Sequence, residues 1–179
     1  SFWELSILAS LPPATVGPAP PNTDSEPALP DSVFVHARAA FPPALPDAPL
    51  VDVFDVSIER ATSLLALAGL GDAFVMLRKP NELSDGQRYR LSLAHTIHLA
   101  ESRDDESAPQ PIVILADEFG ATLDRLTAKI IARNVRQWTK RSNVTFVAAT
   151  THDDLLEALE PDVLIHKGLG ESLEIVRKS

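Results

Sequence analysis

The sequence predicts an α/β fold in which helices flank a parallel β-sheet. Residues Ile112–Ala116 form a continuous apolar run, which is typical of a strand covered on both faces. A helical pattern over Leu123–Arg141 follows this run. A second apolar run, rich in β-branched residues, then spans Asn143–Ala149. A strand, a helix and a strand of these lengths predict a βαβ unit with parallel strands and a right-handed crossover.

Composition limits the classes of protein that fit this fold. A chain of 179 residues is most simply one domain with a sizeable core. The net charge of −9 argues against a surface that coats nucleic acid or anionic lipid. The absence of cysteine excludes disulfides and thiolate metal sites. No apolar run approaches the roughly 20 residues of a membrane helix, so we expect a cytoplasmic protein without a membrane segment.

The first part of the chain is the least regular. Apolar residues at helical spacing in Ser1–Leu11 predict a short helix, which a pair of prolines ends. Residues 12–49 are rich in proline and predict a variable surface loop. Within this loop, only Ser32–Ala37 alternates like a strand. The first residue is serine rather than methionine, so we expect the chain to be either a fragment or a processed piece.

Residues 56–102 read as a helical region. Apolar residues repeat at three and four over Val56–Leu77, with Ser57 as the N-cap and Gly69 as the C-cap before a second short helix. The segment LSDGQ, residues 83–87, then opens a long helix with Ser84 at its N-cap. At the other end of the chain, Val163–His166 and Leu173–Val176 predict a hairpin.

Polar residues follow both predicted parallel strands. Asp117 and Glu118 come after the first strand and His152 comes after the second. The carboxyl ends of neighbouring parallel strands are where open α/β sheets bind ligands. There Asp117 can hold Mg²⁺, Glu118 can hold an attacking water, and His152 can hydrogen-bond a phosphate. The alternative is a pair of solvated acids and a histidine that caps the following helix or is satisfied in the core.

The start of the long helix is a second candidate site. Ser84 and the backbone amides near Gly86 lie at a helix N-terminus, which attracts anions. Gly86 would permit a phosphate to approach closely. We expect the negative side chain of Asp85 to point away from this site. The alternative is a plain helix cap.

Four motifs in this order resemble the C-terminal half of the nucleotide-binding domain of ABC (ATP-binding cassette) ATPases. LSDGQ resembles the signature motif, although Asp85 stands where the family has glycine. Ile112–Asp117 resembles Walker B, and Ala121–Asp124 resembles the D-loop. His152 resembles the switch histidine. The resemblance covers roughly Ile58–Val176.

The resemblance implies one domain over residues 1–179 with a P-loop NTPase-like fold, partial in this chain. Its signature motif would lie in the helical subdomain, 56–102, and residues 111–179 would run from Walker B to the terminal strands. It implies ATP and Mg²⁺, and a head-to-tail dimer with a second ABC-type domain that sandwiches ATP. The residues it assigns are Glu118 and His152 for catalysis, Asp117 for the metal, and Ser84, Gly86, Gln87 and Asp124 for nucleotide binding.

Two expected motifs are missing from the sequence. No G-x-x-x-x-G-K-[ST] Walker A loop occurs, and no glutamine precedes Gln87 to serve as the Q-loop residue. Asp52 is a candidate for the latter place. If Ser1–Leu11 is the helix that directly follows Walker A, the loop should lie immediately upstream of Ser1.

The leading hypothesis is therefore an ATP hydrolase. The alternative is a degenerate cassette that acts as a non-catalytic interaction or regulatory module. A third hypothesis, an ABC-like ATPase of DNA maintenance, conflicts with the acidic charge and the missing coiled-coil insertion. Phe119-Gly120 stands where transporter subunits usually have proline after the glutamate, so the chain looks closest to soluble ABC-type ATPases found with acetyltransferase-like domains. Neither the process driven nor the identity of the dimer partner follows from the sequence.

Overall fold

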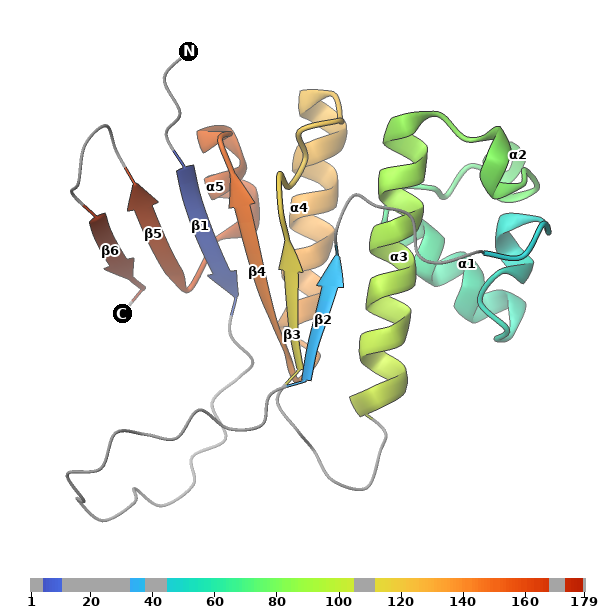
Figure 1. The fold of residues 1–179 in the computed structure, drawn as a ribbon, viewed down its shortest axis with the longest axis horizontal. Coiled ribbons are helices and arrows are strands. Elements are labelled where there is room, and N and C mark those ends of the chain that lie inside the picture. Colours follow the sequence, from blue (N-terminus) through green and yellow to red (C-terminus); the bar gives the residue numbers. More distant parts are fainter. Residues whose placement is uncertain (1–4, 11–32, 38–44, 105–111, 168–172, 179) are drawn as a thin grey trace.

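The computed structural model describes residues 5–10, 33–37, 45–104, 112–167 and 173–178, and these contain a six-stranded mixed sheet flanked by helices (Figure 1). The strand order is β2-β3-β4-β1-β5-β6. The strands are β1 (Leu5–Ser10), β2 (Val33–Ala37), β3 (Ile112–Ala116), β4 (Val144–Thr150), β5 (Val163–Lys167) and β6 (Leu173–Arg177). No helix in these ranges is both long and apolar enough to span a bilayer.

The predicted βαβ unit is confirmed. Strands β3 and β4 pair in parallel, with Ile112 opposite Val144, and helix α4 (Arg125–Thr139) connects them. Strand β2, which matches the predicted Ser32–Ala37 strand, pairs in parallel with β3. Figure 1 shows α4 and α5 (Leu156–Leu159) behind the sheet and α3 (Asp85–Asp104) beside its β2 edge.

The prediction that β3 is covered on both faces is only half right. Its residues alternate between buried and half-buried positions, and so do those of β4. The buried face packs against α4, whose Ile131 and Val135 are fully enclosed. The other face carries Val113 and Leu115, which keep part of their surface. The continuous apolar run therefore corresponds to a strand with one fully buried face and one partly buried face.

The predicted helix over Ser1–Leu11 is wrong. Residues Leu5–Ser10 form β1, which lies inside the sheet and pairs antiparallel with both β4 and β5. The pairing of Ser6 with Thr150 and of Leu5 with Lys167 joins segments that are far apart in the sequence. The hypothesis that this segment is the helix directly after Walker A is therefore also wrong. Most of the predicted 12–49 loop lies outside the described residues.

The helical region agrees with its prediction. Helix α1 (Ile58–Leu67) begins at Ser57, whose side chain accepts a hydrogen bond from the Arg60 N–H, and Gly69 follows its end with φ of +75°. Such a left-handed conformation favours glycine. A short helix, α2 (Ala73–Met76), comes next. Two single 3₁₀ turns, η1 (Leu50–Asp52) and η2 (Pro80–Glu82), complete this region before α3 begins.

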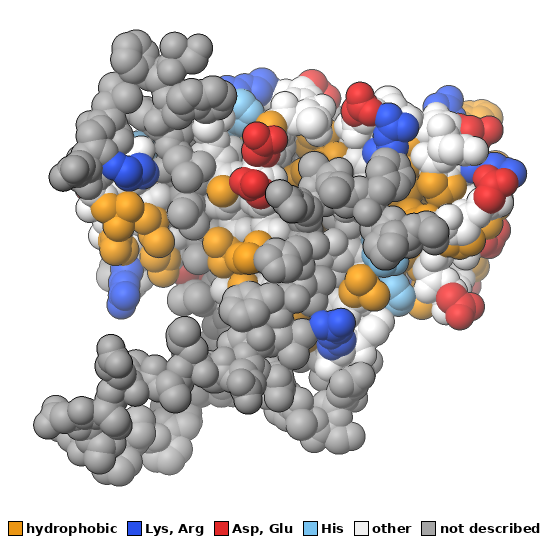
Figure 2. All heavy atoms as spheres, in the orientation of Figure 1, with side chains coloured by type: hydrophobic (Ala, Val, Ile, Leu, Met, Phe, Trp, Pro, Cys, Tyr) orange, Lys and Arg blue, Asp and Glu red, His pale blue; other side chains and the backbone are white. Residues whose placement is uncertain are grey.

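The predicted C-terminal hairpin is confirmed by the antiparallel pairing of β5 and β6. Strand β6 ends the described sheet, and its Leu173, Ile175 and Val176 are each about half exposed. Figure 2 shows hydrophobic side chains over this hairpin on the viewed face.

Candidate functional site

A tight turn places the two predicted acids at the carboxyl end of β3. The Glu118 N–H donates to Asp117 Oδ1 at 3.0 Å, and the Ala121 N–H donates to the Glu118 carbonyl at 2.9 Å. Glu118 has φ of +51°, which is uncommon for a residue other than glycine and is characteristic of strained functional sites. Both carboxylates are exposed to solvent. The turn thus presents two exposed ionisable groups.

Hydrogen bonds join this turn to the end of β4. The Phe119 N–H donates to the Ala149 carbonyl at 2.9 Å. The Thr150 hydroxyl donates to the Phe119 carbonyl at 3.1 Å and accepts from the His152 N–H at 3.2 Å. Residues Glu118 and His152 therefore belong to two segments that share one buried hydroxyl. The His152 side chain makes no capping hydrogen bond to η3 (Asp153–Leu155), so the capping alternative has no support.

Buried side chains pack closely against the same turn. Phe119 is fully buried and meets Phe146 of β4 edge to face, with ring centroids 5.6 Å apart. Gly120 has φ of +79°, and a Cβ there would lie 3.2 Å from Leu155 and 3.3 Å from Ala128. Only glycine fits this position without strain or displacement. The Phe119-Gly120 pair is thus explained by packing.

Ion pairs fix the segment after His152 to the first turns of α4. Asp154 forms ion pairs with Arg125 at 3.1 Å and with Lys129 at 3.6 Å. Because α4 follows the Ala121–Asp124 segment, these contacts hold the two strand-end connections together. Figure 1 shows both connections, and the first turn of α3, at the same upper side of the molecule.

The predicted cap at the start of α3 is confirmed. The Ser84 hydroxyl accepts from the Gln87 N–H at 3.3 Å, and the Gln87 side chain accepts from the Ser84 N–H at 3.0 Å. This reciprocal pair is a capping box. Asp85 forms an ion pair with Arg88 and its side chain is 84% exposed, so it points outward as expected.

The predicted D-loop lies directly against this helix start. A Cβ on Gly86 would lie 3.2 Å from the Thr122 carbonyl oxygen and 3.4 Å from Leu123. The close approach that requires glycine is therefore that of the chain's own loop. Asp124 caps α4 by accepting from the Thr127 N–H at 2.9 Å, and hydrogen bonds from Thr127 lower the pKa of its carboxyl group.

Two residues on α3 were missed by the sequence analysis. Arg90 donates to the Gly69 carbonyl at 2.7 Å and to the Gly86 carbonyl at 3.2 Å, while burial lowers the pKa of its guanidinium. Tyr89 is buried, and its hydroxyl accepts from the Gly120 N–H at 3.3 Å. Tyr89 shares the helical spacing of the apolar residues Leu93 and Ile97, and a buried tyrosine hydroxyl needs a partner. That signal could have identified it.

A pocket of about 410 Å³ lies elsewhere, between α1 and the far ends of α3 and α4. Glu101 in its wall pairs with Arg60 and accepts from Trp138 Nε1 at 2.9 Å. None of the predicted site residues lines it. The pocket is therefore separate from the strand-end site.

The resemblance implies a metal ion at the strand-end residues. Within the described residues, no three histidine, aspartate or glutamate side chains gather as a metal site. Asp117 offers one exposed carboxylate at a strand end, which suits a hard cation that takes its remaining ligands from phosphate and water. The donor set fits Mg²⁺ held together with a nucleotide.

Comparison with known proteins gives a consistent set of relatives. No family model matches the chain. The chain is 30% identical over 118 residues to the lipoprotein-releasing system ATP-binding protein LolD of Rhodopseudomonas palustris, covering 66% of this chain and 46% of that protein. It is 31% identical over 101 residues to the methionine import ATP-binding protein MetN of Myxococcus xanthus (56% and 27%). It is 32% identical over 126 residues to the sulfate/thiosulfate import ATP-binding protein CysA of Acinetobacter baylyi (67% and 32%). The chain spans less than half the length of these relatives.

A solved structure shares the fold. The ATP-binding cassette MJ0796, described as a dimeric post-hydrolysis state bound to ADP and Pi, matches with a TM-score of 0.55 and 18% identity, over 79% of this chain and 65% of that one. The fold is thus that of P-loop NTPases, with a C-terminal antiparallel hairpin. The sequence matches are thus to ATP-binding proteins of transport systems, and the fold matches that of an ATP-binding cassette.

Proposed function

We propose that the chain takes part in ATP binding and hydrolysis, in which water attacks the γ-phosphate of Mg·ATP at a head-to-tail interface between two ABC-type domains. The observation that carries the proposal is the hydrogen-bond chain from His152 through Thr150 to Phe119. It holds the segment of Glu118 against the segment of His152 at the carboxyl edge of two parallel strands, where this class of fold binds ligands.

Each strand-end group then has a distinct task. Glu118, held by its turn, would hold the attacking water and take up its proton. Asp117 would hold the ion directly or through water. Bound Mg²⁺ would neutralise charge on the phosphate oxygens. His152 would donate a hydrogen bond to the γ-phosphate and so report its presence to the Glu118 turn.

The first turn of α3 would serve the nucleotide of the neighbouring subunit. A helix start leaves backbone N–H groups without intrahelical partners, and α3 begins at Asp85. Ser84 and Gln87 satisfy one another in the free chain, so their side chains would have to exchange partners to bind phosphate. Asp124 lies beside this turn and would face the interface. The solved relative that is described as a dimer bound to ADP and Pi supports this arrangement.

Hydrolysis would further need a Walker A loop, which residues 1–179 do not contain. We therefore expect the phosphate cradle to come from outside these residues. That absence is also the observation that favours the second candidate, a non-catalytic interaction module. Failure of the full-length protein to bind any nucleotide would support the module.

The names of the relatives suggest the cellular process that ATP hydrolysis would serve. The reported relatives are named for lipoprotein release and for methionine and sulfate import, which supports a role beside a transport partner. The association with an acetyltransferase-like domain stays a prediction from the sequence. Pull-down of the full-length protein with its neighbouring gene products would distinguish a transport partner from an acetyltransferase-like partner.

The decisive experiment replaces the carboxylate alone. In the full-length protein, Glu118→Gln should abolish ATP hydrolysis while nucleotide stays bound, because the amide cannot accept a proton from water. Glu157→Gln is the matched control, since it makes the same change on an exposed face of α5. Equal hydrolysis by both variants and the native protein would remove Glu118 from the mechanism.

A further inference from the structure

The turn that carries Glu118 has a direct link to α3 in addition to its links to β4. The Gly120 N–H donates to the Tyr89 hydroxyl at 3.3 Å. Tyr89 is the third residue after Gly86, so it lies one helical turn from the helix start. Only 8% of Tyr89 is exposed. A buried hydrogen bond thus joins the helix whose first turn would bind one nucleotide to the turn that would act on the other.

The packing around this bond leaves its donor no ready substitute. Gly120 is fixed by its positive φ and by the nearby side chains of Leu155 and Ala128, and Phe119 beside it is fully buried. A buried backbone N–H that loses its acceptor keeps its full desolvation penalty. Removal of the Tyr89 hydroxyl would therefore favour a shift of the turn until the N–H finds water.

The bond does not change over the physiological pH range. Burial raises the pKa of the Tyr89 hydroxyl to about 12, with the Gly120 hydrogen bond opposing the shift. The phenol is therefore neutral wherever the protein functions. Any effect of the link is a matter of geometry and not of charge.

We propose that Tyr89 is a positioning residue: through the Gly120 N–H it holds the Glu118 turn in register with the first turn of α3, so that the two nucleotide sites touched by one chain are aligned together. This inference rests on the proposed function for its catalytic part. A second contact also joins α3 to this turn, because Gly86 packs against the carbonyl of Thr122, two residues after Gly120.

The test removes a single oxygen atom. In the full-length protein, Tyr89→Phe keeps the ring and deletes the hydroxyl. Thr96→Val is the matched control, because it deletes another buried hydroxyl on α3, one that donates to the Ser92 carbonyl within the helix at 2.9 Å. Three quantities are measured for each variant: the hydrogen-exchange rate of the Gly120 amide by NMR without nucleotide, and kcat and KM for ATP hydrolysis.

We expect Tyr89→Phe to accelerate exchange at Gly120 and to lower kcat, each by roughly threefold to tenfold, the range that one net hydrogen bond allows. KM should change by less than about twofold, because no atom that binds nucleotide is lost. Thr96→Val should leave all three quantities near those of the native protein. Rescue of kcat to the native value in Tyr89→Trp would contradict the proposal, since indole offers no acceptor for the Gly120 N–H.

The outcomes separate the inference from the function on which it rests. Unchanged exchange at Gly120, equal acceleration in Thr96→Val, or faster exchange with native kcat would each overturn the positioning role. If the native protein hydrolyses no ATP and Glu118→Gln is equally inactive, the proposed function has failed. The exchange measurement would then still decide whether Tyr89 holds the turn.

Discussion

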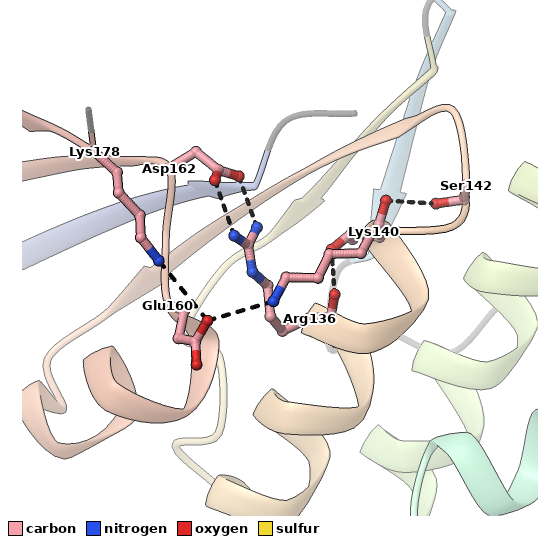
Figure 3. Close-up of polar contacts among 7 residues, drawn as sticks. Arg136, Lys140, Ser142, Glu160, Asp162 and Lys178 are labelled. Atoms are coloured by element: carbon pink, nitrogen blue, oxygen red, sulfur yellow. Dashed lines mark hydrogen bonds and ion pairs between the residues drawn. The ribbon is translucent and has the colours of Figure 1, made fainter. Parts of the chain in front are cut away.

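Loss of the Arg136 guanidinium should loosen the C-terminal hairpin from α4. Arg136 donates to both carboxylate oxygens of Asp162, at 2.7 and 2.9 Å, and Asp162 directly precedes β5 (Figure 3). The Arg136 side chain is 8% exposed and that of Asp162 is 28% exposed. A two-pronged, largely buried pair of this kind fixes the point where the chain turns from α5 into β5.

The magnitude follows from what each change leaves behind. Removing one partner of a fully buried ion pair costs about 3–5 kcal/mol, because the other charge is left without compensation. Asp162 retains some solvent contact and can partly rehydrate, so we expect Arg136→Met to lower the free energy of unfolding by about 2–3 kcal/mol. Lys140→Met is the control: Lys140 and Glu160 are both about half exposed and lie 3.4 Å apart. Exposed pairs contribute about 0–1 kcal/mol.

Urea unfolding of the two variants and hydrogen exchange in β5 would test this. Exchange across Val163–Lys167 should accelerate in Arg136→Met more than in α3, because the loss is local to the hairpin. A double-mutant cycle with Asp162→Asn isolates the pair from the other contacts of each residue, and we expect a coupling of about 1–2 kcal/mol. If Arg136→Met destabilises the protein no more than Lys140→Met does, the pair does not anchor the hairpin.

Two further predictions concern the Glu118 turn. Gly120→Ala should destabilise the protein by about 2 kcal/mol, from the left-handed backbone and the contacts at 3.2 and 3.3 Å, while Gly71→Ala, with its nearest neighbours at 3.6 Å, should change stability by less than about 0.5 kcal/mol in thermal unfolding. Because the folded pKa of Tyr89, about 12, lies above its ordinary value, its contribution is complete below about pH 10 and disappears between about pH 10 and 12. Unfolding at pH 9 and 11.5 should therefore show the native protein losing about 2 kcal/mol that Tyr89→Phe does not lose; equal losses would place the titration elsewhere.

Local patterns were sufficient to predict the strand ends of the site. The apolar runs around Ile114 and Phe146 are interrupted by polar residues at the positions where the strands stop, so Asp117 and His152 could be placed at one sheet edge without coordinates. The N-cap role of Ser84 could also be predicted from sequence, because capping depends on residues within one helical turn. These features share short sequence separation or a repeated apolar period.

Contacts between distant segments carry the rest of the site and could not be read from such patterns. Glycine is favoured at residue 86 because a side chain there would crowd the Thr122 carbonyl. It is favoured at residue 120 because a side chain there would crowd Leu155 and Ala128. The sequence shows both glycines but not the atoms that crowd them. The left-handed conformation of Glu118 is hidden in the same way, since nothing in its own side chain favours it.

The strand β1 shows why one element was assigned wrongly. Its sequence, LSILAS, places apolar residues both at every second position and at a spacing of three, so the strand and helix periods both fit a segment this short. Pairing with β4 and β5 on both sides decides between them, and these partners lie more than 130 residues later. Because β1 runs against β4, its first residues reach the same sheet edge as His152, with Ser6 opposite Thr150. Its carboxyl end therefore points away from the site, and a phosphate-binding loop directly after β1 would start at the wrong edge of the sheet.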